Sequence, residues 1–172
     1  MFPATRWLLV PALLAGWLGL AGSAPAVAPA SPPPIKDDGK FFSAEALDKA
    51  NKRVREIYQN TGKDLVIETF AAIPEDLKKK YEELGKDKFF LEWARRRAED
   101  LGVKGIYVLM CKSPGRVEAI VDKQTGRKAF TTADRDKLVQ KVLARFKEKQ
   151  FDAGLLEGVD FVASTLKAGG SK

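Results

Sequence analysis

The chain has 172 residues, no histidine and one cysteine, Cys111. The lack of histidine excludes Ser-His-Asp and Cys-His nucleophile pairs, histidine-ligated zinc and phosphoryl transfer through histidine. With one cysteine no intramolecular disulfide can form, so the hydrophobic core alone must hold the domain together. The sequence also has no glycine-rich phosphate loop that ends in Lys-Ser or Lys-Thr, and no paired-Asp motif for an aspartyl phosphate.

The cysteine has an arginine downstream, as in the phosphate-binding loop of cysteine phosphatases. That loop needs five residues between the thiolate and the arginine, whereas four separate Cys111 from Arg116, and no histidine precedes the cysteine. We therefore predict a buried thiol at the end of a strand, followed by a hairpin turn.

The N-terminus is typical of a secretory signal peptide over residues 1–23. One arginine precedes residues 7–22, which are uncharged and almost wholly apolar, and small residues then favour cleavage after Ser23, or after Ala26 or Ala28. The alternative is an uncleaved membrane anchor, but this run is shorter than the about 20 apolar residues of a spanning helix. We expect an exported protein, periplasmic or secreted, with no transmembrane segment after cleavage.

Three further segments follow the expected signal peptide. Residues 24–35 are rich in proline and alanine, which predicts a stiff spacer. Residues 36–167 are then enough for one domain with a real core and too few for two. Residues 168–172 form a short polar tail.

The charge of the mature chain is positive. Removing Arg6 from the 30 basic residues leaves 29 against 23 acidic ones, a net charge of +6. Such a surplus favours acidic partners or anionic membrane surfaces. The charges are interleaved and no aromatic-studded basic stripe is present, so we expect no nucleic-acid partner.

Hydrophobic periodicity and turn residues predict an alternation of helices and short strands. The first two strands are joined by a helical crossover and should be parallel, whereas the third returns after a tight turn and should be antiparallel. This order predicts a layered α/β domain with a small mixed sheet. The helices are expected over residues 44–60, 74–84, 88–101, 133–148 and 152–166, and the strands over 65–70, 106–110 and 117–121, with a brief pairing over 128–130.

Several runs of like residues are interpreted as ordinary surface or core. Consecutive residues on a helix point in different directions, so Arg95–Arg97 and Lys78–Lys80 are predicted to be solvated faces. The pairs Phe41-Phe42 and Phe89-Phe90 are predicted to be core staples and not a patch for a partner.

Three stretches follow the pattern of a known family. The first is Asp38-Gly39 before a helix that ends in Thr61-Gly62 and leads into a hydrophobic strand. The second is a helix with Trp93, followed by Gly105 and an aliphatic strand, and the third is the aromatic and glycine pattern of residues 151–159. In this order and spacing, they resemble the TPM-domain family.

The resemblance implies an exported or lumenal protein with a three-layer α/β/α fold. Some members of the family are acid phosphatases or bind divalent cations through carboxylates, and others act in the assembly or repair of membrane proteins. By this resemblance, Asp38 and Asp134 are candidate catalytic residues. Asp37, Asp38, Asp134 and Asp136 are candidate ligands for calcium or magnesium. The alternative for Asp37 and Asp38 is a capped, solvated start of a helix.

The sequence departs from the family pattern where an acidic-polar pair often precedes the glycine of the second strand. Val103 and Lys104 stand there instead, and a lysine in place of a carboxylate repels a divalent cation. Two functions follow. The first is a non-catalytic exported module that binds envelope or membrane proteins, and the alternative is a metal-assisted acid phosphatase that uses Asp38 and Asp134.

Overall fold

The computed structural model describes residues 32–170, so the expected signal peptide and its cleavage position lie outside the described residues. In chain order the elements are β1 (Lys36–Asp37), α1 (Ala44–Thr61), β2 (Asp64–Ala72), a 3-10 turn (Glu75–Leu77), α2 (Lys78–Leu84), α3 (Lys86–Asp100), β3 (Gly105–Ser113), β4 (Arg116–Val121), α4 (Lys123–Lys128), α5 (Thr132–Lys147) and α6 (Phe151–Gly169).

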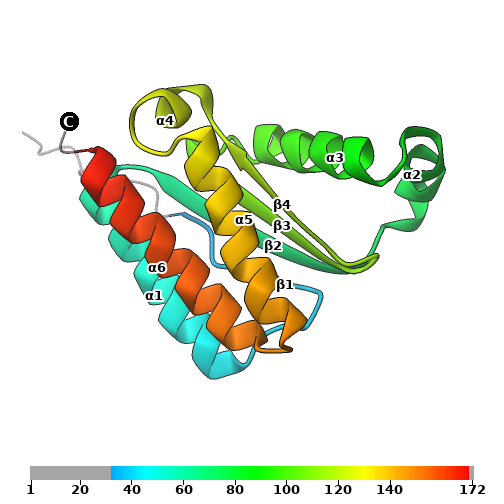
Figure 1. Ribbon diagram of the computed structural model, residues 1–172, viewed down its shortest axis with the longest axis horizontal. Helices are drawn as coiled ribbons and strands as arrows, with labels where there is room; N and C mark the ends of the chain where they lie inside the picture. The colour runs from blue at the N-terminus through cyan, green and yellow to red at the C-terminus, as the bar shows by residue number, and fades with distance from the viewer. Residues whose placement is uncertain (1–31, 171–172) are drawn as a thin grey trace, which may run out of the picture. The chain divides into compact units, whose positions relative to one another are not determined.

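The strands form one mixed sheet in the order β1-β2-β3-β4. As predicted from the sequence, β2 and β3 are parallel and β3 and β4 are antiparallel. Helices α1, α5 and α6 cover one face of the sheet and α3 covers the other, which gives three α/β/α layers (Figure 1). The prediction of a three-layer domain with a small mixed sheet is therefore confirmed.

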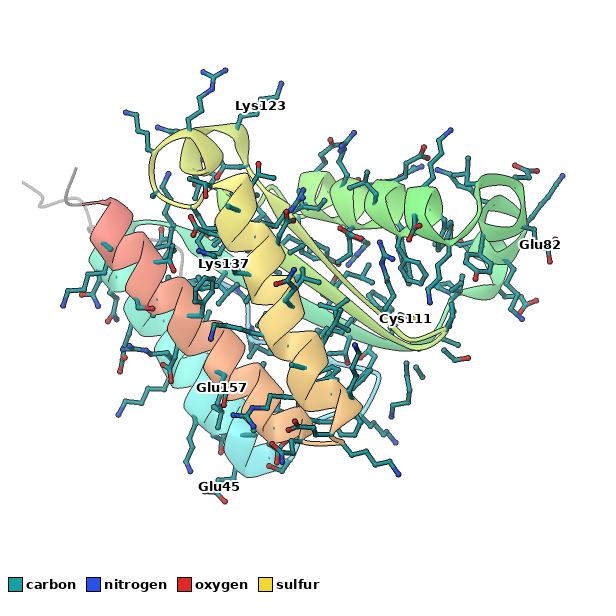
Figure 2. The ribbon with its side chains drawn as sticks, in the orientation of Figure 1. Glu45, Glu82, Cys111, Lys123, Lys137 and Glu157 are labelled. Carbon is teal, nitrogen blue, oxygen red and sulfur yellow. The ribbon has the colours of Figure 1, made fainter. Side chains whose placement is uncertain are left out.

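Each face of the sheet has its own hydrophobic core, because alternate residues of a strand point to opposite sides. Leu65 and Ile67 of β2 face the core under α1, α5 and α6, whereas Val66 faces the core under α3. The predicted staple Phe89-Phe90 lies fully in the second core, with exposed fractions of 1% and 0%. Charged side chains such as Glu45, Glu82 and Lys123 project from the periphery (Figure 2).

Helix α1 begins and ends where its sequence predicts. The Ser43 side chain accepts a hydrogen bond from the Ala46 N–H, and Gly62 ends the helix in the left-handed conformation. The buried stripe of α1 includes Val54 and Ile57, as the helical spacing indicates. Just before β1, the Ile35 N–H donates to the side-chain oxygen of Asn51.

The brief strand expected over residues 128–130 is wrong. The segment from Lys123 to Lys128 is helix α4, because the Asp122 carboxylate accepts hydrogen bonds from the N–H groups of Gln124 and Thr125. The Thr125 carbonyl oxygen then accepts hydrogen bonds from the N–H groups of Ala129 and Phe130, which follow the helix. The Phe130 side chain is fully buried and contacts the Phe161 ring.

Smaller differences concern where elements begin and end. The two-residue strand β1, which pairs with β2, has no sequence signal of its own. Helix α5 begins at Thr132, one residue before its expected start, and Thr131 caps it. Helix α6 continues beyond residue 166 to Gly169, where the chain lies so close to Ala129 that only glycine fits.

No helix within residues 32–170 is both long and apolar enough to cross a bilayer.

One close backbone approach gives a test of the sheet. A Cβ atom on Gly105 would lie 2.1 Å from the carbonyl oxygen of Asp64 on the neighbouring strand, so Gly105→Ala must push β2 and β3 apart. We expect a loss of about 1–3 kcal/mol in the free energy of unfolding, measured by urea denaturation.

The matched control is Gly126→Ala inside α4, where the new Cβ would meet Val121 at an ordinary 3.8 Å. This variant should gain about 0.5–1 kcal/mol through the better helix propensity of alanine. Equal stabilities of the two variants would contradict the role given to the Gly105 contact.

Candidate functional site

The carboxylate of Asp37 closes the turn that follows β1. Its Oδ1 accepts hydrogen bonds from the Phe41 N–H and the Thr69 hydroxyl, and its Oδ2 accepts one from the Phe42 N–H. The Thr69 hydroxyl oxygen in turn accepts the Gly39 N–H at 2.9 Å. Three of the about four lone-pair sites of this carboxylate are therefore occupied by donors of the chain itself.

Asp38 and Asp134 are also engaged. The exposed Asp38 carboxylate pairs with the Lys36 ammonium at 3.0 Å. Asp134 forms a reciprocal capping box with Thr131 at the start of α5. The hydrogen bond from the Thr131 side chain holds the pKa of Asp134 below its usual value.

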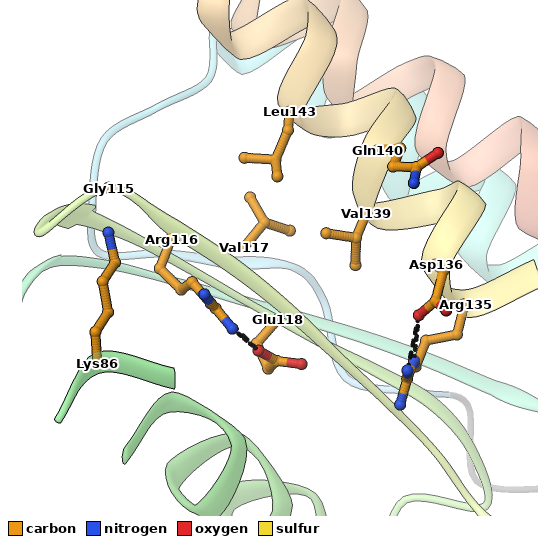
Figure 3. A pocket seen from close by; sticks show the side chains of 10 residues that line it. All are labelled: Lys86, Gly115, Arg116, Val117, Glu118, Arg135, Asp136, Val139, Gln140 and Leu143. Carbon is orange, nitrogen blue, oxygen red and sulfur yellow. Dashed lines mark hydrogen bonds and ion pairs between the residues drawn. The ribbon is translucent and has the colours of Figure 1, made fainter. Parts of the chain in front are cut away.

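Asp136 lies on the rim of a hollow between β4 and α5. Figure 3 shows its carboxylate paired with the Arg135 guanidinium, at 2.7 Å, beside the apolar side chains of Val139 and Leu143. The hollow has a volume of about 450 Å³, and Val117 of β4 also lines it.

A second ion-pair group lines the same hollow. The Arg116 guanidinium contacts Glu118 at 2.8 Å and Asp87 at 2.6 Å, and so links β4 to the start of α3. The hollow therefore combines an apolar wall with two paired arginines and with Lys86, which has no ion pair within residues 32–170.

The structure does not bring the two pairs of candidate aspartates together. The turn that holds Asp37 ends at Phe41, whose ring stacks on Phe146 near the C-terminal end of α5. Asp134 lies at the other end of that helix, twelve residues earlier, which is about 18 Å along the axis. Asp37 and Asp38 thus lie at one end of α5, and Asp134 and Asp136 at the other.

This arrangement does not fit a calcium or magnesium site. Such ions need several oxygen ligands around one point, and residues 32–170 contain no group of three or more acidic, cysteine or histidine side chains placed to hold a metal. A lysine side chain lies near the turn that contains Asp37. The Lys112 ammonium is 3.3 Å from the Lys40 carbonyl oxygen and 4.9 Å from the centre of the Phe41 ring. Its charge opposes the approach of a divalent cation.

Cys111 is buried near the end of β3, and its thiol donates to the Ser113 carbonyl oxygen at 3.3 Å. Burial raises the pKa of the thiol, so the reactive thiolate is disfavoured. The hairpin turn to β4 follows directly. The prediction of a buried thiol before a hairpin is confirmed.

A buried polar cluster that sequence reasoning missed lies under α3. Glu68 of β2 is only 4% exposed. The Arg97 Nε and Nη2 donate to its two carboxylate oxygens at 2.8 and 2.6 Å, and the Tyr107 hydroxyl donates at 2.7 Å. The expectation of a solvated arginine run is therefore wrong for Arg97, which reaches back over the sheet.

The electrostatics of this cluster favour the charged carboxylate. Burial raises the pKa of Glu68, but the hydrogen bonds from Arg97 and Tyr107 and the charge of Arg97 outweigh it, so the pKa lies below its usual value. Burial and the hydrogen bond to Glu68 raise the pKa of Tyr107. The one available signal was Glu68 itself, a carboxylate inside an otherwise apolar strand, with arginines on the helix that follows.

The family pattern of the TPM domain matches residues 35–165 of the chain. The chain belongs to the TPM-domain family. The sequence resemblance is therefore confirmed over nearly the whole described part of this TPM domain.

Solved structures share the fold. The N-terminal domain of a protein from Porphyromonas gingivalis superposes with a TM-score of 0.65 at 15% identity, over 80% of this chain and 84% of that one. The BA42 protein of Bizionia argentinensis gives 0.57 at 16% identity, over 75% and 83%. The N-terminal domain of cg2496 from Corynebacterium glutamicum gives 0.56 at 10% identity, over 82% of each. At such identities the likeness shows the fold alone, and no curated protein matches the sequence.

The Glu68 cluster predicts a pH-dependent loss of stability in Arg97→Met. This variant leaves a buried, unpaired carboxylate and should lower the free energy of unfolding by about 3 kcal/mol at neutral pH. The deficit should shrink as the pH falls towards 4, because Glu68, no longer paired, takes up a proton. In wild type the effect of acid on stability is the reverse. The pKa of Glu68 is lower in the folded than in the unfolded protein, so ionised Glu68 stabilises the fold at pH values above its unfolded pKa, and this stabilisation is lost as the pH falls through its folded pKa.

The matched control is Arg96→Met, one residue away on the same helix but exposed. Its stability should stay within about 0.5 kcal/mol of wild type at both pH values. Urea denaturation at neutral and acidic pH measures both variants. A deficit in Arg97→Met that does not change with pH would contradict this account.

Proposed function

We propose that this TPM domain is an exported, non-catalytic module that binds other envelope or membrane proteins. The observation that carries the proposal is the state of the four candidate carboxylates. Each is engaged by a donor or cation of the chain itself, and the two pairs lie at opposite ends of α5. A metal-assisted phosphatase would need such carboxylates free and together around one metal ion, which in turn holds the phosphate.

The hollow between β4 and α5 supports the binding role. Protein interfaces combine an apolar centre with a polar rim, and the apolar wall of Val139, Leu143 and Val117 beside the Arg116 and Arg135 ion pairs has this character. The uncharged apolar run of residues 7–22 supports export of the domain to where envelope proteins are met.

The metal-assisted acid phosphatase is the competing function, and an assay distinguishes the two. Protein that begins at residue 24 is incubated with an aryl phosphate, with and without calcium or magnesium. We expect no turnover above the uncatalysed rate and no calcium-dependent rise in Tm, because the carboxylates are already engaged.

Two variants make this assay decisive. Asp38→Asn removes a candidate catalytic carboxylate, whereas Lys52→Gln changes an exposed residue of α1 that has no ion pair within the described residues. Metal-dependent turnover that is lost in the first variant and kept in the second would overturn the non-catalytic proposal.

Binding through the hollow is tested by photo-crosslinking in the native cell. A benzoylphenylalanine is placed at Gln140, an exposed residue that lines the hollow, or at Lys52, which lies on α1 beyond α6 (Figure 1). We expect a light-dependent adduct with an envelope or membrane protein from position 140 and not from position 52. No adduct from position 140, or the same adducts from both positions, would count against this surface.

A further inference from the structure

Four phenylalanines gather at the end of the domain where α5 meets α6. Phe41 stacks on Phe146 with ring centroids 5.5 Å apart, and Phe151 lies edge-on to both at 5.7 and 5.1 Å. Phe42 completes this four-Phe cluster, 5.8 Å from Phe41. Phe41 and Phe42 come from the turn after β1, whereas Phe146 lies in the last turn of α5 and Phe151 begins α6. The turn and these helix ends lie at the same end of the helical layer (Figure 1).

This cluster is more than a part of the core. All four side chains are partly exposed, and Phe41 and Phe151 belong to neither hydrophobic core. The sequence-based interpretation of Phe41 as a core staple therefore does not hold. The hollows beside β4 and under α3 lie elsewhere and include no ring of the cluster.

Lysines surround the four-Phe cluster. Lys40 precedes Phe41, and Lys112 lies over the Phe41 ring. Lys147 is the last residue of α5, and Lys149 lies in the connection to α6. All four are exposed, and none forms an ion pair with a residue in the described part of the chain.

The carboxylates nearby are, by contrast, already engaged. Asp37 accepts three hydrogen bonds and Asp38 pairs with Lys36. Glu148 forms an ion pair with Arg145, and the Asp152 carboxylate accepts a hydrogen bond from the Ser43 N–H. Asp37 and Asp152 keep their negative charges because their donors are neutral, but the four unpaired lysines outnumber these two carboxylates, so the balance at the cluster is positive.

We propose that the four-Phe cluster and its lysines form a docking surface for an anionic lipid bilayer. Lysines near an anionic membrane each contribute about 1 kcal/mol of attraction, and phenylalanine is typical of the apolar face that a membrane-surface element buries at the headgroup boundary. A fluid lipid surface needs no matching pocket, which suits an aromatic group that lines none of the larger hollows. Docking would hold the domain at the membrane, beyond any contact that it makes with proteins.

The first test measures binding of protein 24–172 to vesicles by sedimentation. Residues 31–172 form one compact unit with both cores, so this protein keeps the fold and lacks the apolar N-terminal run. We expect binding to phosphatidylcholine–phosphatidylglycerol vesicles that weakens with added salt, and little binding to phosphatidylcholine alone. Equal binding to both vesicles, or to neither, would overturn the proposal.

Two charge-matched double variants locate the surface. Lys112→Gln with Lys149→Gln should lower the partition coefficient about 30-fold, the effect of two lysines at about 1 kcal/mol each. Lys123→Gln with Lys128→Gln, on the exposed side of α4, should lower it less than about 3-fold. Equal losses in the two double variants would show attraction by net charge alone and would refute a defined surface.

A tryptophan reports whether the rings meet the lipid. Protein 24–172 contains one native tryptophan, the buried Trp93. Phe151→Trp should give a blue-shifted emission with anionic vesicles, whereas Leu101→Trp, at a residue 43% exposed at the end of α3, should not. The same shift in both variants, or none in Phe151→Trp, would contradict insertion at the cluster.

A final arm separates a membrane from an acidic protein partner. Poly-glutamate supplies the same negative charge without lipid. Tight binding of poly-glutamate with no binding to anionic vesicles would overturn the lipid assignment. Because the vesicles contain no protein, their outcome is independent of whether the hollow beside β4 binds an envelope protein.

Discussion

The bidentate salt bridge between Arg97 and Glu68, together with the hydrogen bond from Tyr107, joins three elements of the domain at one buried point. Glu68 lies in β2, Tyr107 comes from β3, and Arg97 reaches down from α3. Lys36 of β1 pairs with Glu68 in the sheet register. The position of α3 then fixes the aromatic packing of Phe89, Phe90 and Trp93 on that face, and the Arg116 bridge to Asp87 ties the same helix to β4. A carboxylate left without its arginine would weaken all of these contacts together.

Two of the candidate aspartates, Asp37 and Asp134, hold the backbone together in this chain. Asp37 closes the turn after β1, and Asp134 caps α5. Lys112 occupies the space beside that turn with a positive charge. The family resemblance names carboxylates as candidate site residues and does not say what each of them contacts. What a carboxylate does there depends on its neighbours, and here they are donors of the chain itself.

Much of the fold could be predicted from local sequence. Helix α1 follows from the Ser43 cap, the apolar stripe and Gly62, and the parallel pairing of β2 and β3 follows from the helical crossover between them. Helix α4 could not be predicted in the same way, because its six residues are too short for a periodic pattern and depend on the Asp122 cap. The pairing of Arg97 with Glu68 could not be predicted either, because Glu68 lies 29 residues away on another element. Contacts of that range follow from the fold and not from spacing.

The buried thiol of Cys111 has a consequence for how the domain matures. With its thiolate disfavoured and its donor engaged by Ser113, the sulfur is a poor partner for thiol–disulfide exchange. With one cysteine in the chain, no internal disulfide has to form or rearrange during folding. In the folded domain, burial of the sulfur also disfavours a covalent dimer through this residue.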